Sequence, residues 1–493
     1  MKQLTKILLI IITAFIVLGG MTGCTTNPLT GQRNFNIVSD QEEVYIGKQV
    51  HKQIKAQFGL YEDKEMQTYV YDIGQRLVNV SDRKEIKYHF YVLDSPIINA
   101  FAVPGGYIYV TRGAMTEINT EAELAAVLGH ELGHVTARHG AQKLSQARAA
   151  QGGMILASIF AKDVVDNWGG LINVGINLAI LGYGRENELE SDQLGVIHAY
   201  RAGWHPNGME EFLITLQKKE DHDPSNLEQM LQSHPATKER IQFAKKKRRQ
   251  VMDKLSPEEQ QQLIVKEDDY KRKINGIVYG PGKKMGELKN NTYKNYEYGI
   301  NWTIPSSWKV QKLSQNEINA LLQAEHNKKT QLFLQTVQMK DNIKLEDLTK
   351  AVIESRKATV KQQVNVTIGG HPAQLTDVEG GSKYPQYRIY TMIVGKYGYI
   401  FTYFNQTQIT YDDFKTAVIN SLQQFKIMNE TERQKYAPKK LQIYTIKSGD
   451  TFTSISTKFY GTNKHAKKLA IFNGYNSETD KPKTGMILKI PPL

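Results

Sequence analysis

Two histidines and a glutamate lie within five consecutive residues, His130-Glu131-Leu132-Gly133-His134. Residues at i and i+4 share one face of a helix, so both imidazoles can bind one zinc ion. Glu131 lies about 100° further round the helix, given its roughly 3.6-residue turn, where its carboxylate can reach a metal-bound water. Zinc lowers the pKa of such a water to about 7, and the carboxylate can take its proton as it attacks a carbonyl carbon. The motif predicts zinc-dependent hydrolysis, although an ordinary amphipathic helix can also carry two histidines at this spacing.

The residues around this motif have the pattern of a buried helix. Thr120 and Glu123 have the spacing of a capping box, and Gly140 stands where a helix commonly ends. Apolar residues recur between them at helical spacing: Leu124, Val127, Leu128 and Val135. We therefore expect this face to pack against a core, which would hold both histidines in place and keep bulk water from the metal.

A third protein ligand is expected, because catalytic zinc usually has three protein ligands and one open position. The downstream histidine of the metzincins does not fit, since Gly140 ends the predicted helix too early. The best candidate is Glu188, 54 residues after His134 on a predicted second helix. Asp192 follows one turn later, where it could hydrogen-bond a ligand histidine. The alternative is an acidic helix face that only meets solvent.

These motifs resemble zinc metallopeptidase family 48, of the HtpX and CAAX-prenyl-endopeptidase type, and most of all its soluble, exported lipoprotein branch. Three further segments carry the resemblance: Asn99 to Val110, Ser233-His234-Pro235 with Arg240, and Ile274 to Gly280. Two positions depart from the family pattern, because Gly184 stands where a serine is usual and Ser191 where an alanine is usual. The resemblance implies one zinc per chain and polypeptide substrates.

The resemblance also assigns roles to His234 and Arg240. His234 precedes a proline, which disfavours a mid-helix position. In the family arrangement these two residues lie across the zinc from the base, where they could stabilise the oxyanion of a tetrahedral intermediate. Alternatively, a neutral His234 could occupy the open position of zinc and hold the enzyme latent.

A predicted strand next to the site offers a way to bind substrate. Residues 107–111 alternate aromatic and β-branched side chains after a Pro-Gly-Gly turn. The resemblance identifies the preceding segment as an active-site edge strand: Asn99, Ala100, Phe101 and Ala102. An exposed edge would bind an extended polypeptide as an added strand through main-chain hydrogen bonds. From the residues alone, a plain core strand is equally consistent.

The first 24 residues indicate export. Lys2 and Lys6 precede an apolar run over residues 7–18, which predicts a lipoprotein signal peptide at residues 1–23. Residues 21–23 and Cys24 resemble a lipobox, so Cys24 would become the lipidated first residue; an uncleaved membrane anchor is the alternative. Cys24 is the only cysteine of 493 residues, which suits an oxidising compartment. With threonine after the cysteine, the family sorting rule points to the outer membrane, if the organism has two membranes.

The charge balance is strongly basic, with a formal net charge of +13. In a cytosolic protein this would favour nucleic-acid binding. Because the N-terminus predicts export, we expect no nucleic-acid partner and interpret the excess as affinity for anionic wall or lipid surfaces.

The remaining sequence predicts two further domains. After a metallopeptidase domain at residues 24–280, residues 291–428 read as an antiparallel-sheet α+β module of unknown role, followed by a polar linker at 429–440. Residues 441–493 resemble a LysM module with the order strand, helix, helix, strand. That resemblance implies binding of the N-acetylglucosamine chains of peptidoglycan at six residues: Gly449, Asp450, Thr451, Phe452, Asn473 and Gly474.

Taken together, the sequence predicts an α+β multidomain protein whose mainly helical, zincin-type catalytic domain carries a small sheet. The predicted function is a zinc endopeptidase that cleaves unfolded or misassembled envelope proteins while held at membrane and peptidoglycan. The alternative is a largely latent chaperone or assembly factor whose zinc site is plugged by His234. A cell-wall hydrolase is a third interpretation, less favoured because such enzymes normally use other zinc-ligand patterns.

Overall fold

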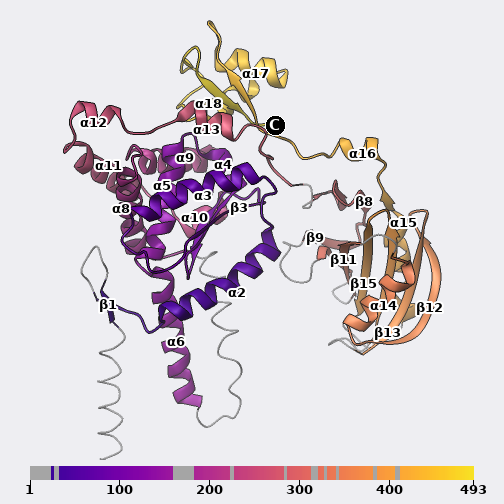
Figure 1. Cartoon of the computed structure of the whole chain (residues 1–493). Coiled ribbons are helices and arrows are strands. Elements are labelled where there is room, and N and C mark those ends of the chain that lie inside the picture. Colours follow the sequence, from indigo (N-terminus) through magenta and orange to yellow (C-terminus); the bar gives the residue numbers. More distant parts are fainter. Residues whose placement is uncertain are drawn as a thin grey trace, which may run out of the picture. The chain divides into compact units, whose positions relative to one another are not determined.

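The computed structural model describes residues 24–26, 33–158, 182–222, 227–282, 286–312, 320–326, 330–339, 343–380, 386–405 and 411–492. The predicted signal peptide at 1–23 lies outside these residues. The chain forms two compact units, one of residues 1–279 with 440–493 and the other of residues 280–439 (Figure 1). Its fold is mixed α+β, as the sequence predicted.

The first unit carries the histidine motif between a small sheet and a set of helices. The strands β3 (His89–Leu93), β5 (Tyr107–Thr111) and β4 (Ala100–Val103) lie in this order, with β3 parallel and β4 antiparallel to β5. A separate hairpin pairs β1 (Cys24–Thr26) with β2 (Arg33–Phe35). The helices are α2 (Asp40–Phe58), α3 (Lys64–Asn79), α4 (Arg112–Glu117), α5 (Glu121–Thr136), α6 (His139–Ser158), α8 (Arg185–Arg201), α9 (Gly208–His222), α10 (Glu228–Ser233), α11 (Lys238–Met252), α12 (Pro257–Gln261) and α13 (Glu267–Lys273). Helices α3 and α5 pack against each other and against the sheet.

The ends of the motif helix α5 differ from the prediction in detail. Thr120 is the N-cap, and its hydroxyl accepts a hydrogen bond from the amide of Glu123 at 3.0 Å. The carboxylate of Glu123 accepts from the amide of Asn119 rather than that of Thr120. The helix ends at Thr136, before Gly140, because Arg138 adopts a left-handed conformation (φ 58°) that turns the chain into α6. Gly140 therefore lies in the first turn of α6 and is not the predicted stop.

The C-terminal segment has the predicted order of strand, helix, helix and strand. Its elements are β17 (Gln442–Thr445), α17 (Phe452–Tyr460), the short 3₁₀ helix η2 (Asn463–His465), α18 (Ala466–Phe472) and β18 (Ile487–Ile490). The two strands pair antiparallel. Thr451 caps α17 by accepting a hydrogen bond from the Ser454 amide, and Phe452 and Ile455 are buried in a small core beneath it.

The second unit is built on antiparallel sheets, as predicted for this module. A seven-stranded sheet has the order β12-β13-β14-β15-β11-β10-β9, and a four-stranded sheet has the order β16-β8-β7-β6. Their bounds are β6 (Glu287–Lys289), β7 (Thr292–Asn295), β8 (Ile300–Thr303), β9 (Trp308–Lys312), β10 (Ala320–His326), β11 (Thr330–Gln338), β12 (Thr359–Ile368), β13 (His371–Glu379), β14 (Gln386–Val394), β15 (Tyr397–Asn405) and β16 (Phe425–Ile427). The second unit also contains the helices α14 (Leu345–Ser355) and α15 (Tyr411–Gln423).

The segment predicted as a linker is structured over part of its length. Residues Glu430–Gln434 form α16, which is capped by Asn429 and belongs to the second unit. Lys440, the first residue after this unit, belongs to the first unit and forms a β-bridge with Val278 of that unit. Residues 429–440 are therefore not an unstructured linker over their whole length. Within the described part of the chain, no helix has the length and apolar character needed to cross a membrane.

Candidate active site

The two helices that carry the predicted ligands meet through small residues. A methyl group added at Gly133 of α5 would lie 3.0 Å from Cβ of Leu194 and 3.2 Å from Cα of Ser191, both on α8. One added at Gly129 would lie 3.2 Å from Cα of Gly195. These glycines let the backbones of α5 and α8 approach closely. That approach brings the motif histidines, which flank Gly133 on α5, within reach of the carboxylates of α8.

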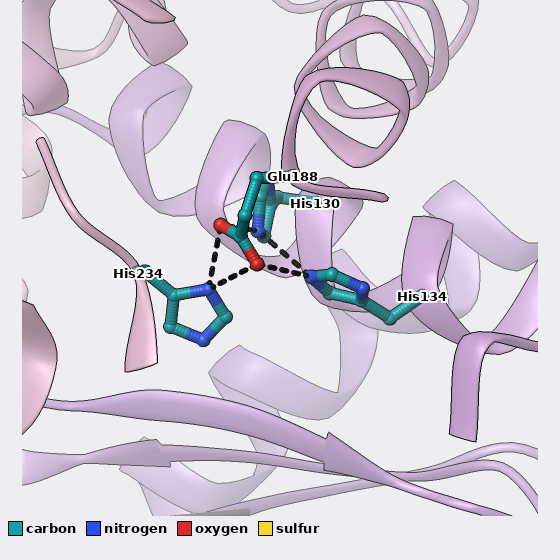
Figure 2. A group of neighbouring side chains, drawn as sticks. All are labelled: His130, His134, Glu188 and His234. Atoms are coloured by element: carbon teal, nitrogen blue, oxygen red, sulfur yellow. Dashed lines mark hydrogen bonds and ion pairs between the residues drawn. The ribbon is translucent and has the colours of Figure 1, made fainter. Parts of the chain in front are cut away.

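Four buried side chains converge at this crossing, as Figure 2 shows. The Nε2 atoms of His130 and His134 lie 3.1 Å apart, and the carboxylate oxygens of Glu188 lie 3.5 and 3.4 Å from them. Nδ1 of His234 lies 3.0 and 3.1 Å from the same two oxygens. One ligand atom from each of the four residues lies within 4.8 Å of the others. The structure thus brings together all three predicted metal ligands, and His234 joins them.

The donor set fits a zinc ion. Ligand atoms about 2.0 Å from a tetrahedral ion are about 3.3 Å from one another, which is close to the separations between His130, His134 and Glu188. Nδ1 of His130 is 2.9 Å from Oδ1 of Asp192. A proton on Nδ1 of His130 would face this carboxylate, which would leave the Nε2 lone pair for a metal. Asp192 therefore lies where the sequence placed it, behind a ligand histidine.

The second ligand histidine has a different support. Nδ1 of His134 is 2.9 Å from Nδ1 of His139, whose Nε2 lies 3.3 Å from Glu190. The ring of Tyr183 stacks on that of His134, with centroids 4.0 Å apart. Neither His139 nor Tyr183 was among the predicted site residues. His139 follows the motif by five positions and Tyr183 precedes the ligand helix, so proximity in sequence was the available signal.

The environment of the cluster shifts the pKa values of its histidines and of Glu188 in different directions. Burial disfavours the charged form of His130, but hydrogen bonds with Asp192 and Glu188 outweigh it and raise the pKa of this imidazole to about 9. Burial also raises the pKa of acids, yet the groups around Glu188, His234 first among them, hold the pKa of this carboxyl well below its usual range. Burial lowers the pKa of His134 well below its ordinary value. A buried carboxylate beside a neutral imidazole is an environment that favours a cation.

Glu131 is placed as a base should be. Its side chain is buried, and its Oε2 atom has no hydrogen-bond partner among the described residues. A cavity of about 10 Å³ adjoins Glu131, His130 and His234, which is room for about one water molecule. An orphaned carboxylate oxygen next to such a space is where a nucleophilic water would be held.

Arg240 pairs with two carboxylates of the ligand helix α8. Its Nε and Nη2 each lie 2.7 Å from an oxygen of Asp192, and its Nη1 lies 2.9 Å from Glu188 and 3.1 Å from the carbonyl of Pro235. Each guanidinium nitrogen therefore already has an acceptor. Arg240 holds Glu188 and Asp192 in place, with a bidentate pairing to Asp192, and its predicted role at the oxyanion stays a prediction.

His234 ends helix α10 just before Pro235, in agreement with the expected non-helical backbone. Its Nδ1 faces Glu188, and its Nε2 lies 3.6 Å from Oε1 of Glu131. His234 is thus within reach of both the ligand carboxylate and the base. This geometry suits a fourth ligand at least as well as an oxyanion donor.

The predicted substrate strand lies at the edge of its sheet but is not exposed. Ala100, Phe101 and Ala102 are in β4, the outer strand, and all of them are buried, as is Asn99. Asn99 accepts a hydrogen bond from the Ser233 hydroxyl at 3.4 Å, which ties the strand to the His234 loop. The prediction of an exposed edge is therefore wrong for this conformation, because all four residues are buried.

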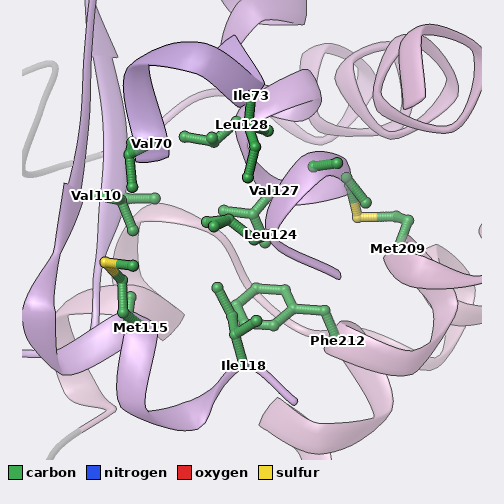
Figure 3. Close-up of a cluster of buried hydrophobic side chains, with 14 of the residues drawn as sticks. Val70, Ile73, Val110, Met115, Ile118, Leu124, Val127, Leu128, Met209 and Phe212 are labelled. Carbon is green, nitrogen blue, oxygen red and sulfur yellow. The ribbon is translucent and has the colours of Figure 1, made fainter. Parts of the chain in front are cut away.

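The opposite face of α5 packs into the main core of the first unit. Leu124, Val127 and Leu128 contact neighbouring core residues, as Figure 3 shows: Val70, Ile73, Val110, Met115, Ile118, Met209 and Phe212. Burying each large apolar side chain contributes about 1.5–3 kcal/mol. The apolar face predicted from sequence thus anchors the helix that presents the metal ligands.

The predicted glycan-binding residues have mixed roles in the fold. Phe452 is buried in the small core, and the Asn473 side chain bonds with the backbone of Leu469 and Lys489. Asp450 accepts hydrogen bonds from the Lys447 amide and the Tyr444 hydroxyl. The remaining three, Gly449, Thr451 and Gly474, are exposed.

Comparison with protein families agrees with this geometry. Residues 64–248 match Peptidase family M48, and residues 444–491 match the LysM domain. The chain therefore contains an M48 peptidase domain and a LysM domain. The cluster of His130, His134, Glu188 and Glu131 lies inside the matched peptidase segment.

Curated relatives include peptidases from fungi and bacteria. The mitochondrial metalloendopeptidase OMA1 of Schizosaccharomyces pombe is 30% identical over 43% of this chain and 63% of its own length. The beta-barrel assembly-enhancing proteases of Yersinia pestis and Escherichia coli K12 are 28% and 26% identical, over 46% and 51% of this chain. The chain spans about half the length of these two bacterial relatives, 48% and 54% respectively.

Proposed function

We propose that this protein is a zinc-dependent endopeptidase of the bacterial cell envelope that cleaves unfolded or misassembled envelope proteins. The observation that carries the proposal is the buried convergence of His130, His134 and Glu188 beside the orphaned carboxylate of Glu131. When bound there, zinc would polarise the scissile carbonyl and acidify a water molecule. The matched peptidase domain and the bacterial relatives support this class of activity.

The surrounding residues have distinct tasks in this mechanism. Burial raises the pKa of the Glu131 carboxyl, so that it can hold a proton taken from water and deliver it to the leaving nitrogen. Asp192 fixes the ring orientation of His130, and His139 does the same for His134. Arg240 compensates the charge of the two carboxylates on α8.

Metal analysis combined with a protein-cleavage assay tests this proposal. We expect about one equivalent of zinc in the wild-type protein and cleavage of unfolded casein. Glu131→Gln should keep its zinc but lose cleavage by about 10²- to 10⁴-fold, because an amide cannot accept the proton. Glu186→Gln, at an exposed position of α8, is the matched control. Full zinc content in a His130→Ala, His134→Ala double variant, or normal cleavage by Glu131→Gln, would refute the assignment.

A latent chaperone or assembly factor is the second candidate, favoured by the position of His234. Its imidazole joins the metal group, and the substrate strand β4 is buried, so the structure has the features of a closed state. If His234 plugs the metal, His234→Ala should raise basal cleavage; if it assists catalysis, cleavage should fall. Rescue of a null strain by Glu131→Gln as complete as that by wild type would favour the non-proteolytic role.

Two attachments would place the enzyme in the envelope. Acyl chains on Cys24 would hold it at a membrane, and the LysM domain suggests binding to peptidoglycan. Cys24→Ala should release the protein from membranes or stall its processing. The full-length protein should sediment with purified peptidoglycan, and N-acetylglucosamine oligomers should compete with this binding. Sedimentation that these oligomers leave unchanged would count against the glycan site and favour binding through surface charge.

A further inference from the structure

The seven-stranded sheet of the second unit ends in an uncovered strand, β12. The strand order places β12 at the margin of the sheet, where it pairs with β13 alone (Figure 1). Residues 359–365 are exposed in succession, so side chains on both faces of the strand meet solvent. Strand β14, in the interior of the same sheet, is instead buried along most of its length. Strand β12 is therefore open on both faces as well as on its outer edge.

The outer main-chain groups of β12 are available for pairing. In an antiparallel pair, alternate residues direct their N–H and C=O groups away from the partner strand. Among the described residues, none outside β13 forms a hydrogen bond with the main chain of β12. The register with β13 is regular over residues 362–368, a length of about 23 Å. This edge can accept one more strand.

The usual protection of an edge strand is present at only one end of β12. Natural proteins protect such edges with charged residues, proline or a bulge. A bulge at Lys361 interrupts the register with β13, and Lys361 pairs with Glu379. Residues 362–368 carry neither a charge nor a proline. The regular stretch thus lacks the features that discourage strand addition, as expected of an edge that binds a partner.

The two faces of this stretch differ in polarity. Val366 packs against the larger core of the unit, and Val364, on the same face, remains 38% exposed. The residues between and beside them lie on the other face and are polar: Gln363, Asn365 and Thr367. A strand added to β12 would therefore meet apolar side chains on one face and polar side chains on the other.

We propose that β12 binds extended segments of unfolded polypeptides as an added strand along residues 362–368. Main-chain pairing tolerates many sequences, and the side chains of the edge strand select among them. The apolar face at Val364 and Val366 favours segments that alternate apolar and polar residues, which folded proteins keep as half-buried strands. This inference builds on the proposed function, because it gives the same class of polypeptide a contact outside the metal centre. It also gives the module at residues 291–428 a role.

A second copy of the chain is the less favoured occupant of this edge. A strip about 23 Å long and about 10 Å deep on each partner would bury roughly 500 Å² in total. Stable protein–protein interfaces bury about 1,200–2,000 Å². The edge is therefore too small to hold a dimer by itself, but it suits the weak, reversible contact that a substrate polypeptide needs.

Hydrogen exchange and fluorescence anisotropy with labelled casein test the proposal on the full chain carrying Glu131→Gln. We expect casein to slow amide exchange in β12. Adding Gln362→Lys and Val364→Lys should weaken casein binding at least about tenfold, because an added strand would have to desolvate two ammonium groups. The matched control adds Val337→Lys and Gln338→Lys, which place the same charges at exposed positions of β11. Thermal melting establishes that both variants are folded.

The outcomes separate strand addition from other contacts. Unchanged exchange in β12 on addition of casein, or equal casein affinity of the two lysine variants, overturns the proposal. A dimer seen by light scattering that Gln362→Lys with Val364→Lys converts to a monomer also overturns it and identifies a second copy as the occupant. Zinc content and cleavage decide the proposed function separately. A protein that binds casein through β12 but never cleaves it would refute the peptidase and leave this inference standing.

Discussion

The metal centre and the LysM junction, where Lys489 of β18 meets residues 116–118, both bury charged groups that come from distant parts of the chain, but they compensate them differently. At the centre, carboxylates meet a guanidinium and imidazoles through direct ion pairs and bidentate bonds, as between Arg240 and Asp192. At the junction between the LysM and peptidase domains, Lys489 instead donates to the main-chain carbonyls of residues 116–118. The centre thus balances its charges with charged side chains, whereas the junction satisfies its buried cation with main-chain dipoles.

The largest effect should follow from removing the cation of the metal centre. Arg240→Met leaves Asp192 and Glu188 buried without their partner, and breaking a buried pair in this way costs about 3–5 kcal/mol. Because Arg240 also orients a metal ligand, zinc affinity should fall by about 10- to 100-fold. Urea unfolding and zinc retention against a chelator measure the two effects. Arg249→Met, at an exposed position of α11, is the control. Equal stability of both variants would mean that the ion pairs of Arg240 do not contribute to the unfolding free energy.

A somewhat smaller loss is expected when the buried cation of the junction is removed. Lys489→Met leaves the carbonyls of residues 116–118 without their shared donor, which we expect to cost about 3 kcal/mol of unfolding free energy. Urea unfolding of the variant measures this loss. Lys481→Met removes an exposed lysine from the same domain and should change little. If Lys489→Met were as stable as wild type, the docking of the LysM domain would not depend on this contact.

The contrast between the two regions also explains what could be predicted from sequence. His130 and His134 were found because the chemistry of zinc imposes residue types and a short helical spacing, and Glu188 was found because a third ligand is needed and an acidic helix follows. The pairing of Arg240 with two carboxylates was missed, because an arginine has the same signature whether it binds an oxyanion or an ion-pair partner. The glycines at 129 and 133 revealed their role only once α8 lay against them.

The fold beyond the motif was predictable to different degrees. The hairpin of β14 and β15 followed from alternation and turn residues, which are local signals. The order of the LysM elements followed from the resemblance to that module. Docking of the LysM domain was not foreseen, since Lys489 looks like any strand lysine until its burial is known. Local patterns therefore specified the elements, and long-range packing decided how the peptidase and LysM domains join.

The pH dependence of stability offers a third test, on the helix that faces the junction. Burial raises the pKa of Glu211, on α9, to about 7 from an ordinary value of 4.5. Between these values the folded protein holds a proton that the unfolded chain has released, so rising pH favours unfolding. The unfolding free energy should thus fall by about 1–3 kcal/mol through this group as pH rises from 5 to about 7. Glu211→Gln should flatten that slope, whereas Glu220→Gln, exposed on the same helix, should not. Identical slopes in both variants would mean that Glu211 titrates as it does in the unfolded chain.

The smallest effect concerns the start of the helix that carries Glu188 and Asp192. Gly184 is the N-cap of α8, its backbone is extended (φ −73°, ψ 158°), and it has no side chain to accept a hydrogen bond from the first turn. A methyl group added there would contact nothing within 4 Å, so a larger residue fits without strain. Gly184→Ser should supply the missing acceptor and stabilise the protein by a few tenths of a kcal/mol, whereas Gly184→Ala should lower stability because alanine is a poor N-cap. Thermal melting of the three proteins measures both changes. If serine also raises zinc retention, the start of α8 limits how firmly the centre holds its ligands; if it raises stability alone, the packing against α5 already fixes them.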